Sequence, residues 1–419
     1  MSHITQCRAV QMRIFLEDQM MKRLSRGAVV AIAGAALMTT LAAGAADYHG
    51  RKAWTLQNDK IQVIVTPGGG HIASMTLRSG SGSGVNPLWL PPWKSSEPGE
   101  WEKAGGFYGD KPGAQLLSTI MGQNVCLDFF GAPSPEEIKA GIPVHGEAPT
   151  VNWAAITKSD AKLSYGTFLP NAQMKVTRSI SLAPGSSALW ISETVENQTA
   201  FDRPFGWNQH VTLGPPFLEA GVSRYDMNAT WGMVDGREFS KGQRLKQGGE
   251  FEWPNAPGAN GESIDLRTFP GKEKTNSDFT ANVMTTDREW VYFTAINPKK
   301  HLLIGYLWPR KDWPWAANWE ENHFRTGTPW KGKAVARGIE FGTTPFAYSR
   351  RDVVTMGKLH DTPTYRWIAA REKQTISYAA FLAPIPEGTT GVTDVKMTKN
   401  GVEISLEGAD KPILLALKK

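Results

Sequence analysis

Short runs in which apolar and polar residues alternate fill most of the chain from Ala53 onward, and Gly, Pro or Asn closes many of them. Residues 61–65 form one such run, and residues 72–78 form the next after Pro67-Gly68-Gly69-Gly70. Alternation with period 2 predicts half-buried strands, and the glycine run between them predicts a hairpin turn. Comparable patterns predict further strands at 174–182, 189–196, 289–296, 302–307 and 375–382.

Helical signals are few. Residues 134–140 are predicted to form a short helix, because Ser134 can cap it and Pro135-Glu136-Glu137 suit its first turn. The stretch 87–113 is rich in Trp, Pro and Gly and is predicted to be a long surface loop. A last hairpin is expected to turn at Asn400-Gly401.

These elements predict an all-β fold, a large antiparallel β-sandwich with few short helices. No repeat of fixed period and no low-complexity linker interrupts residues 47–419, so we expect a single domain there. Residues 387–419 are a candidate hairpin appendage at its C-terminal end.

The first 46 residues have a different pattern and are predicted to be an N-terminal extension followed by a secretory signal peptide. Met21-Lys22-Arg23 is a positive start, an apolar stretch covers 27–41, and Ala43-Gly44-Ala45 supplies small residues for cleavage. A membrane anchor is the alternative, but the apolar run is short for a span. We therefore expect an exported protein, periplasmic or secreted, that is free of the membrane after cleavage.

Charge and cysteine content narrow the function classes. Residues 1–46 carry five of the 46 basic and two of the 40 acidic residues, so the net charge falls from +6 to +3 without them. Such a balance does not indicate a nucleic-acid partner. Cys126 would be the one cysteine left, which excludes an intramolecular disulfide and a cysteine-based zinc site.

Tryptophan is abundant, at 16 residues. Most of these rings are expected in a large core, but some can stack on the C–H faces of sugar rings. Residues 313–323 are the densest aromatic and acidic segment; we expect Trp319 as a stacking platform and Glu320 as a hydroxyl-binding group. Glu320 and Glu321 cannot act together as a hydrolytic pair, because neighbours in a strand point to opposite faces.

Four short segments contain the candidate chemistry. The first is Val144-His145-Gly146-Glu147. The second begins at Asn197 and continues through Arg203-Pro204-Phe205-Gly206-Trp207-Asn208-Gln209-His210. The third is Ile264-Asp265-Leu266-Arg267, and the fourth is Gly338-Ile339-Glu340 with Pro345 downstream.

In this order the four segments, over about residues 54–385, resemble the landmarks of the aldose 1-epimerase (galactose mutarotase) family. That family has a Leu-His-Gly-Gly element, a strand ending in Asn, a Pro-Phe stretch followed by His, a Phe-Asp-Leu/Phe-Arg element and a late strand with Glu. The resemblance implies a galactose mutarotase-like sandwich and the interconversion of the anomers of an aldose. It implies no metal and no cofactor.

The resemblance also implies roles for individual residues. Glu340 would be the base that takes the proton of the anomeric hydroxyl, and His210 the acid that protonates the ring oxygen. His145 would donate a hydrogen bond to the sugar, and Asp265 would accept from sugar hydroxyls with Arg267 orienting it. Trp207 and Asn124 complete the expected substrate-binding set. Asn124 lies in a segment, Met121-Gly122-Gln123-Asn124, where the family usually has Arg.

Two other functions stay open from the sequence. One is a non-catalytic carbohydrate-binding protein on the same fold, a reading motivated by the departures at Gln123 and Glu147. The other is an accessory domain related to polysaccharide lyases or glycosidases. In each case the expected partner is a sugar or an oligosaccharide, and the sequence does not indicate the oligomeric state.

Overall fold

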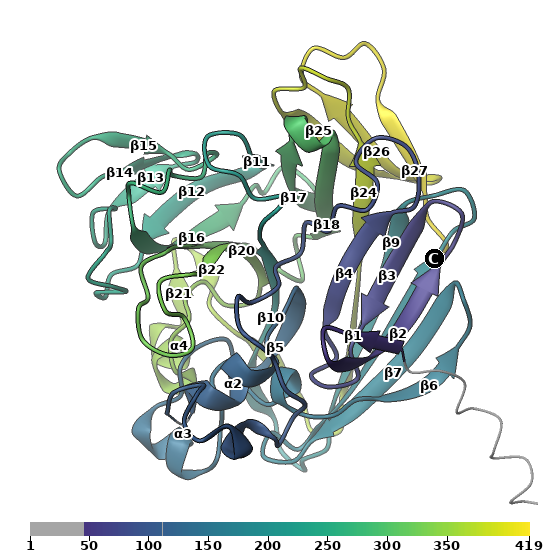
Figure 1. The fold of residues 1–419 in the computed structure, drawn as a ribbon. Coiled ribbons are helices and arrows are strands. Elements are labelled where there is room, and N and C mark those ends of the chain that lie inside the picture. The colour runs from purple at the N-terminus through teal and green to yellow at the C-terminus, as the bar shows by residue number, and fades with distance from the viewer. Residues whose placement is uncertain (1–45, 111) are drawn as a thin grey trace, which may run out of the picture. The chain divides into compact units, whose positions relative to one another are not determined.

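The computed structural model describes residues 46–110 and 112–419. These residues form one compact unit built on two large antiparallel sheets, shown in Figure 1. The fold is the large antiparallel β-sandwich that the sequence predicts. The expected leader lies outside the described residues, and no described helix is long and apolar enough to span a membrane.

The first sheet carries the candidate site. Its central strands, β5, β10, β20 and β19, are neighbours. In spatial order its strands are β1 (Ala46–Tyr48), β2 (Arg51–Gln57), β3 (Ile61–Val65), β4 (Ile72–Leu77), β5 (Gln123–Asp128), β10 (Arg203–Leu213), β20 (Val335–Gly342), β19 (Trp315–Asn322), β16 (Asn276–Met284), β12 (Ala229–Val234) and β13 (Glu250–Glu252), and β23 (Arg366–Ile368) pairs with β10.

The second sheet lies face to face with the first. One continuous core fills the space between them, with residues such as Val211 and Phe341 from the first sheet and Ile191 and Tyr378 from the second. In spatial order its strands are β11 (Arg224–Met227), β17 (Trp290–Asn297), β18 (Leu302–Pro309), β24 (Lys373–Pro384), β9 (Ala188–Asn197), β8 (Met174–Leu182), β7 (Lys162–Leu169) and β6 (Ala154–Lys158).

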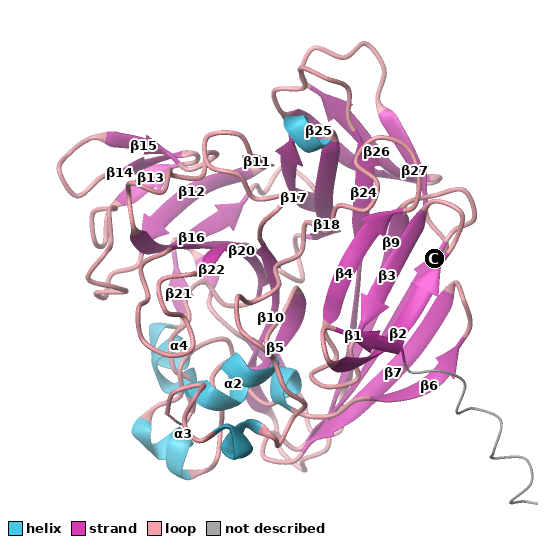
Figure 2. Ribbon diagram, in the orientation of Figure 1, coloured by secondary structure: helices cyan, strands magenta, loops and turns pink. Residues whose placement is uncertain are grey.

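The helices are short, and Figure 2 shows that most lie together at one end of the sandwich. They are η1 (Trp101–Ala104), α2 (Gly113–Thr119), α3 (Pro135–Lys139), η2 (Ala148–Thr150), η3 (Pro298–Lys300) and α4 (Arg350–Met356). The expected cap of α3 is present as a capping box: the Ser134 hydroxyl accepts from the Glu137 N–H, and the Glu137 carboxylate accepts from the Ser134 N–H. The short helix η1 interrupts the predicted loop 87–113, and α2 begins at its last residue and lies in front of β5 and β10 in Figure 1.

Two small sheets sit at the edges. β14 (Asn255–Pro257) and β15 (Ser263–Asp265) extend a lobe beyond β12 and β13, and β21 (Lys358–Leu359) pairs with β22 (Thr362–Pro363).

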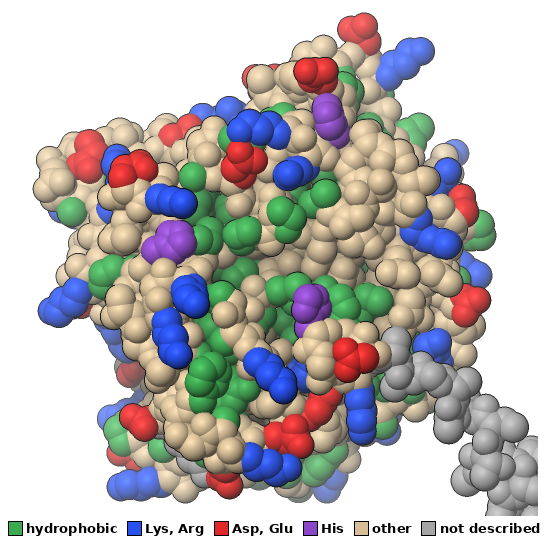
Figure 3. Space-filling model, in the orientation of Figure 1, with side chains coloured by type: hydrophobic (Ala, Val, Ile, Leu, Met, Phe, Trp, Pro, Cys, Tyr) green, Lys and Arg blue, Asp and Glu red, His purple; other side chains and the backbone are tan. Residues whose placement is uncertain are grey.

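In Figure 3 apolar side chains reach the surface around α2 and the strands behind it.

The C-terminal segment is more than the expected hairpin. β25 (Val392–Thr398) and β26 (Gly401–Leu406) form that hairpin around Asn400-Gly401, and β27 (Ile413–Ala416) adds a third strand. Its inner face, including Ile404, packs on Leu303, Phe381 and their neighbours on the second sheet. Both faces of β18 and part of β24 are therefore buried, and every residue of β18 is buried.

The contact of the C-terminal sheet is expected to contribute measurably to stability. Ile404 is fully buried, so Ile404→Ala should lower the free energy of unfolding by about 2–4 kcal/mol. Leu414 is 69% exposed in the neighbouring strand, so Leu414→Ala should change it by less than about 0.5 kcal/mol. Urea unfolding of both variants measures the difference. Equal effects would show that the contact is not a stabilising interface.

Candidate functional site

Three adjacent strands bring the candidate residues into one row. In the antiparallel register of the first sheet, His210 on β10 lies opposite Asn124 on β5 and opposite Glu340 on β20. Residues directly opposite one another in a ladder project from the same face of the sheet. Backbone pairing alone therefore places these three side chains together, although they are 86 to 216 positions apart along the chain.

His210 and Glu340 contact each other directly. The distance from His210 Nε2 to Glu340 Oε1 is 2.9 Å, and both side chains are almost completely buried. On the other side of the ring, His210 Nδ1 lies 3.0 Å from the Thr212 hydroxyl. Oε2 of Glu340 is buried and has no hydrogen-bond partner in the described part of the chain. This oxygen is free to accept a hydrogen bond from a ligand.

The carboxylate of Glu340 lies over Gly338, two residues earlier in the same strand. A Cβ atom at position 338 would lie 2.5 Å from Glu340 Oε1 and 3.2 Å from Cε3 of Trp319. Both distances are shorter than ordinary van der Waals contacts. Position 338 therefore has to be glycine for the carboxylate to hold its present orientation.

His145 reaches the same place from a loop. Gly146, with φ of +74°, lets this loop approach β5 so closely that a Cβ there would lie 2.2 Å from the Leu127 carbonyl oxygen. The His145 ring centroid is 5.0 Å from that of His210. Its Nδ1 is 2.5 Å from the Phe130 carbonyl oxygen, which can only accept, so Nδ1 carries a hydrogen.

The electrostatic state of His145 follows from its burial. Desolvation, followed by the proximity of His210, lowers the pKa of His145 to about 3. The ring is therefore neutral near pH 7, and its Nε2 presents a lone pair. This changes the role expected from the sequence, because a neutral ring bonded in this way accepts a hydrogen bond from a hydroxyl and does not donate one.

These side chains line a cleft of about 410 Å³. That volume lies within the range of about 300–1,000 Å³ that is usual for small-molecule sites. Its apolar lining comes from α2, Ile120, Val144, Phe239 and Phe279. His145, His210 and Glu340 form its polar end.

An aromatic and cationic rim completes the cleft. Trp319 lines it with its ring centroid 6.0 Å from that of His210, as the sequence expectation for a platform requires. Trp330 lies next to Trp319, and the guanidinium of Arg325 lies over the Trp330 ring at 4.8 Å. The Arg325 side chain is also held from behind by the Glu321 carboxylate at 3.4 Å.

Two candidate residues, Trp207 and Glu320, project from the faces of their strands that point away from the cleft. Trp207 is three positions from His210, so it points into the core between the sheets, where its Nε1 donates to Glu193 Oε2. Glu320 follows Trp319 directly and points away from the cleft for the same reason. Both assignments to the substrate-binding set are thus corrected.

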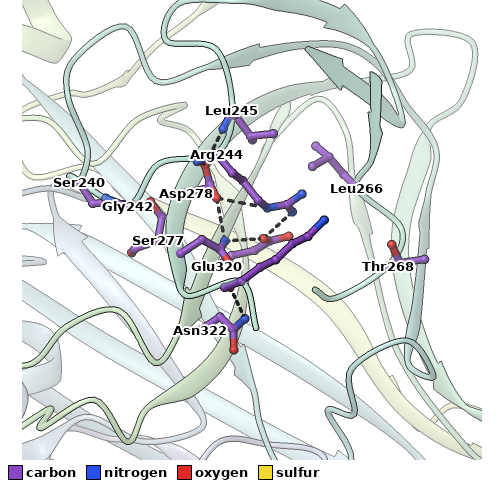
Figure 4. Close-up of polar contacts among 12 residues, drawn as sticks. Ser240, Gly242, Arg244, Leu245, Leu266, Thr268, Ser277, Asp278, Glu320 and Asn322 are labelled. Carbon is purple, nitrogen blue, oxygen red and sulfur yellow. Dashed lines mark hydrogen bonds and ion pairs between the residues drawn. The ribbon is translucent and has the colours of Figure 1, made fainter. Parts of the chain in front are cut away.

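Glu320 belongs instead to a buried polar network, shown in Figure 4. Its carboxylate bonds Arg244 at 2.7 Å and Arg337 at 2.9 Å. Burial raises the pKa of Glu320, but the positive charges of Arg244 and Arg337 together lower it by more than burial raises it. The pKa of Glu320 therefore lies below its ordinary value. Asp278 lies beside the network, and burial together with the Glu320 charge raises its pKa to about 6.

Asp265 and Arg267 are not in the cleft either. They form an ion pair of 2.7 Å with each other at the β14–β15 lobe, and each side chain is about one-third exposed. Asp265 lines a separate groove next to Arg244 and Asn276. This local ion pair explains why Asp265 and Arg267 stand two residues apart in the sequence. The expectation that Asp265 accepts hydrogen bonds from sugar hydroxyls, with Arg267 orienting it, is thus corrected.

Asn124 lies in the row beside His210 but does not line the cleft itself. Its Nδ2 is buried without a hydrogen-bond partner among the described residues. It is therefore placed to support His210 from the side. The described residues contain no group of three or more His, Cys, Asp or Glu side chains arranged to hold a metal ion.

Sequence reasoning missed several lining residues: Leu116, Leu117, Ile120, Phe239, Phe279, Arg325 and Trp330. Phe279 stands on a strand whose residues are all buried, so no alternation marks its face. Most of the others come from loops and from α2. Only the aromatic content of the segments around them could have suggested a role.

The comparisons with known proteins agree on the fold. No family model matches the sequence, and no curated protein matches it. Among solved structures, a candidate aldose 1-epimerase from Klebsiella pneumoniae is 14% identical, with a TM-score of 0.58 and coverage of 80% of this chain and 79% of that one.

Two further structures are similar at lower scores. An aldose epimerase homologue from C. elegans is 12% identical, covering 80% of this chain and 99% of that one with a TM-score of 0.51. A galactose mutarotase-like protein from Clostridium acetobutylicum is 12% identical, covering 81% and 98% with a TM-score of 0.50. The chain thus has the galactose mutarotase-like β-sandwich fold, and its structural neighbours are aldose 1-epimerase-like and mutarotase-like proteins.

The neutral state of His145 is open to direct measurement. With a pKa of about 3, its ring carbon and nitrogen signals should not shift between about pH 5 and pH 8. NMR of protein labelled at histidine, with His145→Gln to assign the signal, tests this. A titration midpoint near the ordinary value of about 6.5 would contradict the buried, neutral ring.

Proposed function

We propose that this protein interconverts the anomers of an aldose by general acid–base catalysis at His210 and Glu340. The observation that carries the proposal is the contact of these two side chains at the end of a cleft, with one carboxylate oxygen of Glu340 free of any hydrogen-bond partner among the described residues. The fold of the structural neighbours, aldose epimerase homologues among them, supports a sugar as the ligand.

Ring opening needs two proton transfers at atoms attached to the same carbon. The free Oε2 of Glu340 takes the proton of the anomeric hydroxyl while the C1–O5 bond breaks, and the exocyclic oxygen becomes the carbonyl oxygen of the aldehyde. The imidazolium form of His210 gives its Nε2 proton to O5. Because O1 and O5 are both bonded to C1, an acid and a base that lie side by side can serve them together.

In this mechanism the acid and the base act on C1 from the same side of the sugar. With His210 Nε2 only 2.9 Å from Glu340 Oε1, the sugar cannot insert between the two groups and has to approach both from the cleft. In the free protein the Nε2–H group of His210 donates to the carboxylate of Glu340. When the sugar is bound, a movement of the imidazole ring turns this N–H group toward O5. Thr212 holds the far side of the ring during this movement.

Ring closure returns both groups to their starting states. After the aldehyde carbon has rotated, His210 takes the proton back from O5 as it attacks C1, and Glu340 returns its proton to O1. No proton is gained or lost over the cycle. His145 accepts a hydrogen bond from a neighbouring hydroxyl through its Nε2 lone pair and so fixes the position of the ring.

Removal of the base is the decisive test. Glu340→Gln keeps the size of the side chain but cannot take a proton, so the catalysed rate should fall by about 10²-fold or more. Polarimetry or NMR exchange on a panel of freshly dissolved aldoses, with α-glucose and α-galactose among them, measures the rate. The thermal unfolding midpoint serves as the folding control.

Two results would contradict catalysis. The first is a wild-type protein that accelerates none of the sugars, and the second is a Glu340→Gln variant that is as fast as wild type. If sugar binding persisted in the first case, the protein would be a non-catalytic carbohydrate-binding protein on the same fold.

Gly338 provides an independent test of the carboxylate's orientation. Gly338→Ala places a methyl group where Glu340 Oε1 now lies, so we expect at least a tenfold loss of rate, about 1.4 kcal/mol. Gly232→Ala on β12 serves as a control, since it crowds Phe251 on β13 and Asn282 on β16, none of which lines the cleft. If Gly338→Ala kept full activity, the orientation of Glu340 would not matter for the reaction.

A further inference from the structure

The polar side chains of the cleft are gathered mostly at one end. Its polar side chains are His145, His210, Glu340 and Arg325, and the first three are gathered at the reacting end. The remaining side chains of the lining are apolar or aromatic: Leu116, Leu117, Ile120, Ala132, Val144, Phe239, Phe279, Trp319, Trp330 and Ala347. The further donors on these side chains are the indole N–H groups of Trp319 and Trp330, and Trp319 Nε1 is buried without a partner among the described residues.

An unmodified hexose fits such a lining poorly. It has a hydroxyl on nearly every carbon, and a hydroxyl that leaves water costs free energy unless it finds a new hydrogen-bond partner. Hydroxyls at the reacting end can reach Glu340 and His145. Those away from the reacting end would meet the apolar part of the lining, such as Leu116, Leu117 and Val144, whose side chains can neither donate nor accept.

The charge of Arg325 does not make the cleft suitable for an unmodified or an anionic sugar. Its charge is partly compensated by Glu321 at 3.4 Å, and its guanidinium plane rests on Trp330 at 4.8 Å. In this position it closes the aromatic wall of the cleft. A site built for an anionic sugar would need further permanent cations, and the other lining residues include no Lys or Arg.

We infer that the substrate of this site is a partly masked aldose. Its anomeric hydroxyl is free, while hydroxyls away from C1 are missing or carry apolar substituents, as in deoxy, O-alkyl or O-acyl sugars. This inference rests on the proposed function, because it names the substrate class of the same site. Apolar substituents would pack on α2 and Val144 and displace water from that wall.

A pair of sugars that differ only in masking tests the inference. Tetra-O-methylglucose keeps a free anomeric hydroxyl and has the ring of glucose, but its other hydroxyls are methylated. We expect its kcat/KM for anomer interconversion to exceed that of glucose at least tenfold, which equals about 1.4 kcal/mol. Equal rates, or a preference for glucose, would overturn the inference and leave the proposed function intact.

Binding separates the two possible failures. If the protein accelerates neither sugar, the proposed function fails, and quenching of tryptophan fluorescence still compares their affinities. Tighter binding of the methylated sugar then supports the inference, whereas equal or weaker binding overturns it.

A matched pair of variants locates the effect in the cleft. Val144→Thr keeps the shape of the side chain and adds one hydroxyl to the apolar wall, so the preference for the methylated sugar should fall at least threefold. Val85→Thr makes the same change away from the cleft and should leave the preference unchanged. An unchanged preference in Val144→Thr would overturn the assignment of this wall.

Discussion

The antiparallel register between β10 and β20 is the constraint on which the site depends. It sets His210 opposite Glu340, and a slip of one residue would turn one of the two side chains into the core. The register is held on both sides, because β5 pairs with β10 and β19 pairs with β20 along most of their lengths. The acid and the base are therefore positioned by the backbone of four strands, a loop contributes His145, and the rest of the lining comes from neighbouring strands, α2 and loops.

The reverse face of these strands explains why the floor of the cleft can be rigid. Beneath β10, Glu193 accepts hydrogen bonds from Arg178, Trp207, Gln209 and Tyr378, which joins the two sheets through the core. Beneath β19 and β20, Glu320 joins Arg244 to Arg337. Buried ion pairs are costly to form but even more costly to break singly. These networks favour one arrangement of the strands over nearby alternatives.

Part of the fold and of the candidate site could be predicted from the sequence. Why a given strand or residue could or could not be predicted depends on its surroundings. Strands such as β8 and β9 alternate clearly because one face is buried, whereas β16 and β18 are buried on both faces and alternate poorly. The order of landmarks singled out His210, Glu340 and His145, and the aromatic density of residues 313–323 singled out Trp319. Period 2 alone would have removed Trp207 and Glu320 from the candidates, since each stands an odd number of positions from a cleft residue. Arg325 and Trp330 come from a loop, where no periodic signal exists.

The C-terminal three-stranded sheet has a consequence for the order of folding. The strands whose outer face it covers begin with β9 at residue 188 and end with β24 at residue 384, while the cover itself is complete only at residue 416. During synthesis the apolar face of Leu303 and Phe381 thus exists before its partner does. A chain that has been synthesised only as far as β24 therefore exposes this face until β25, β26 and β27 have followed, and exposed apolar surface of this kind makes incomplete chains prone to aggregation.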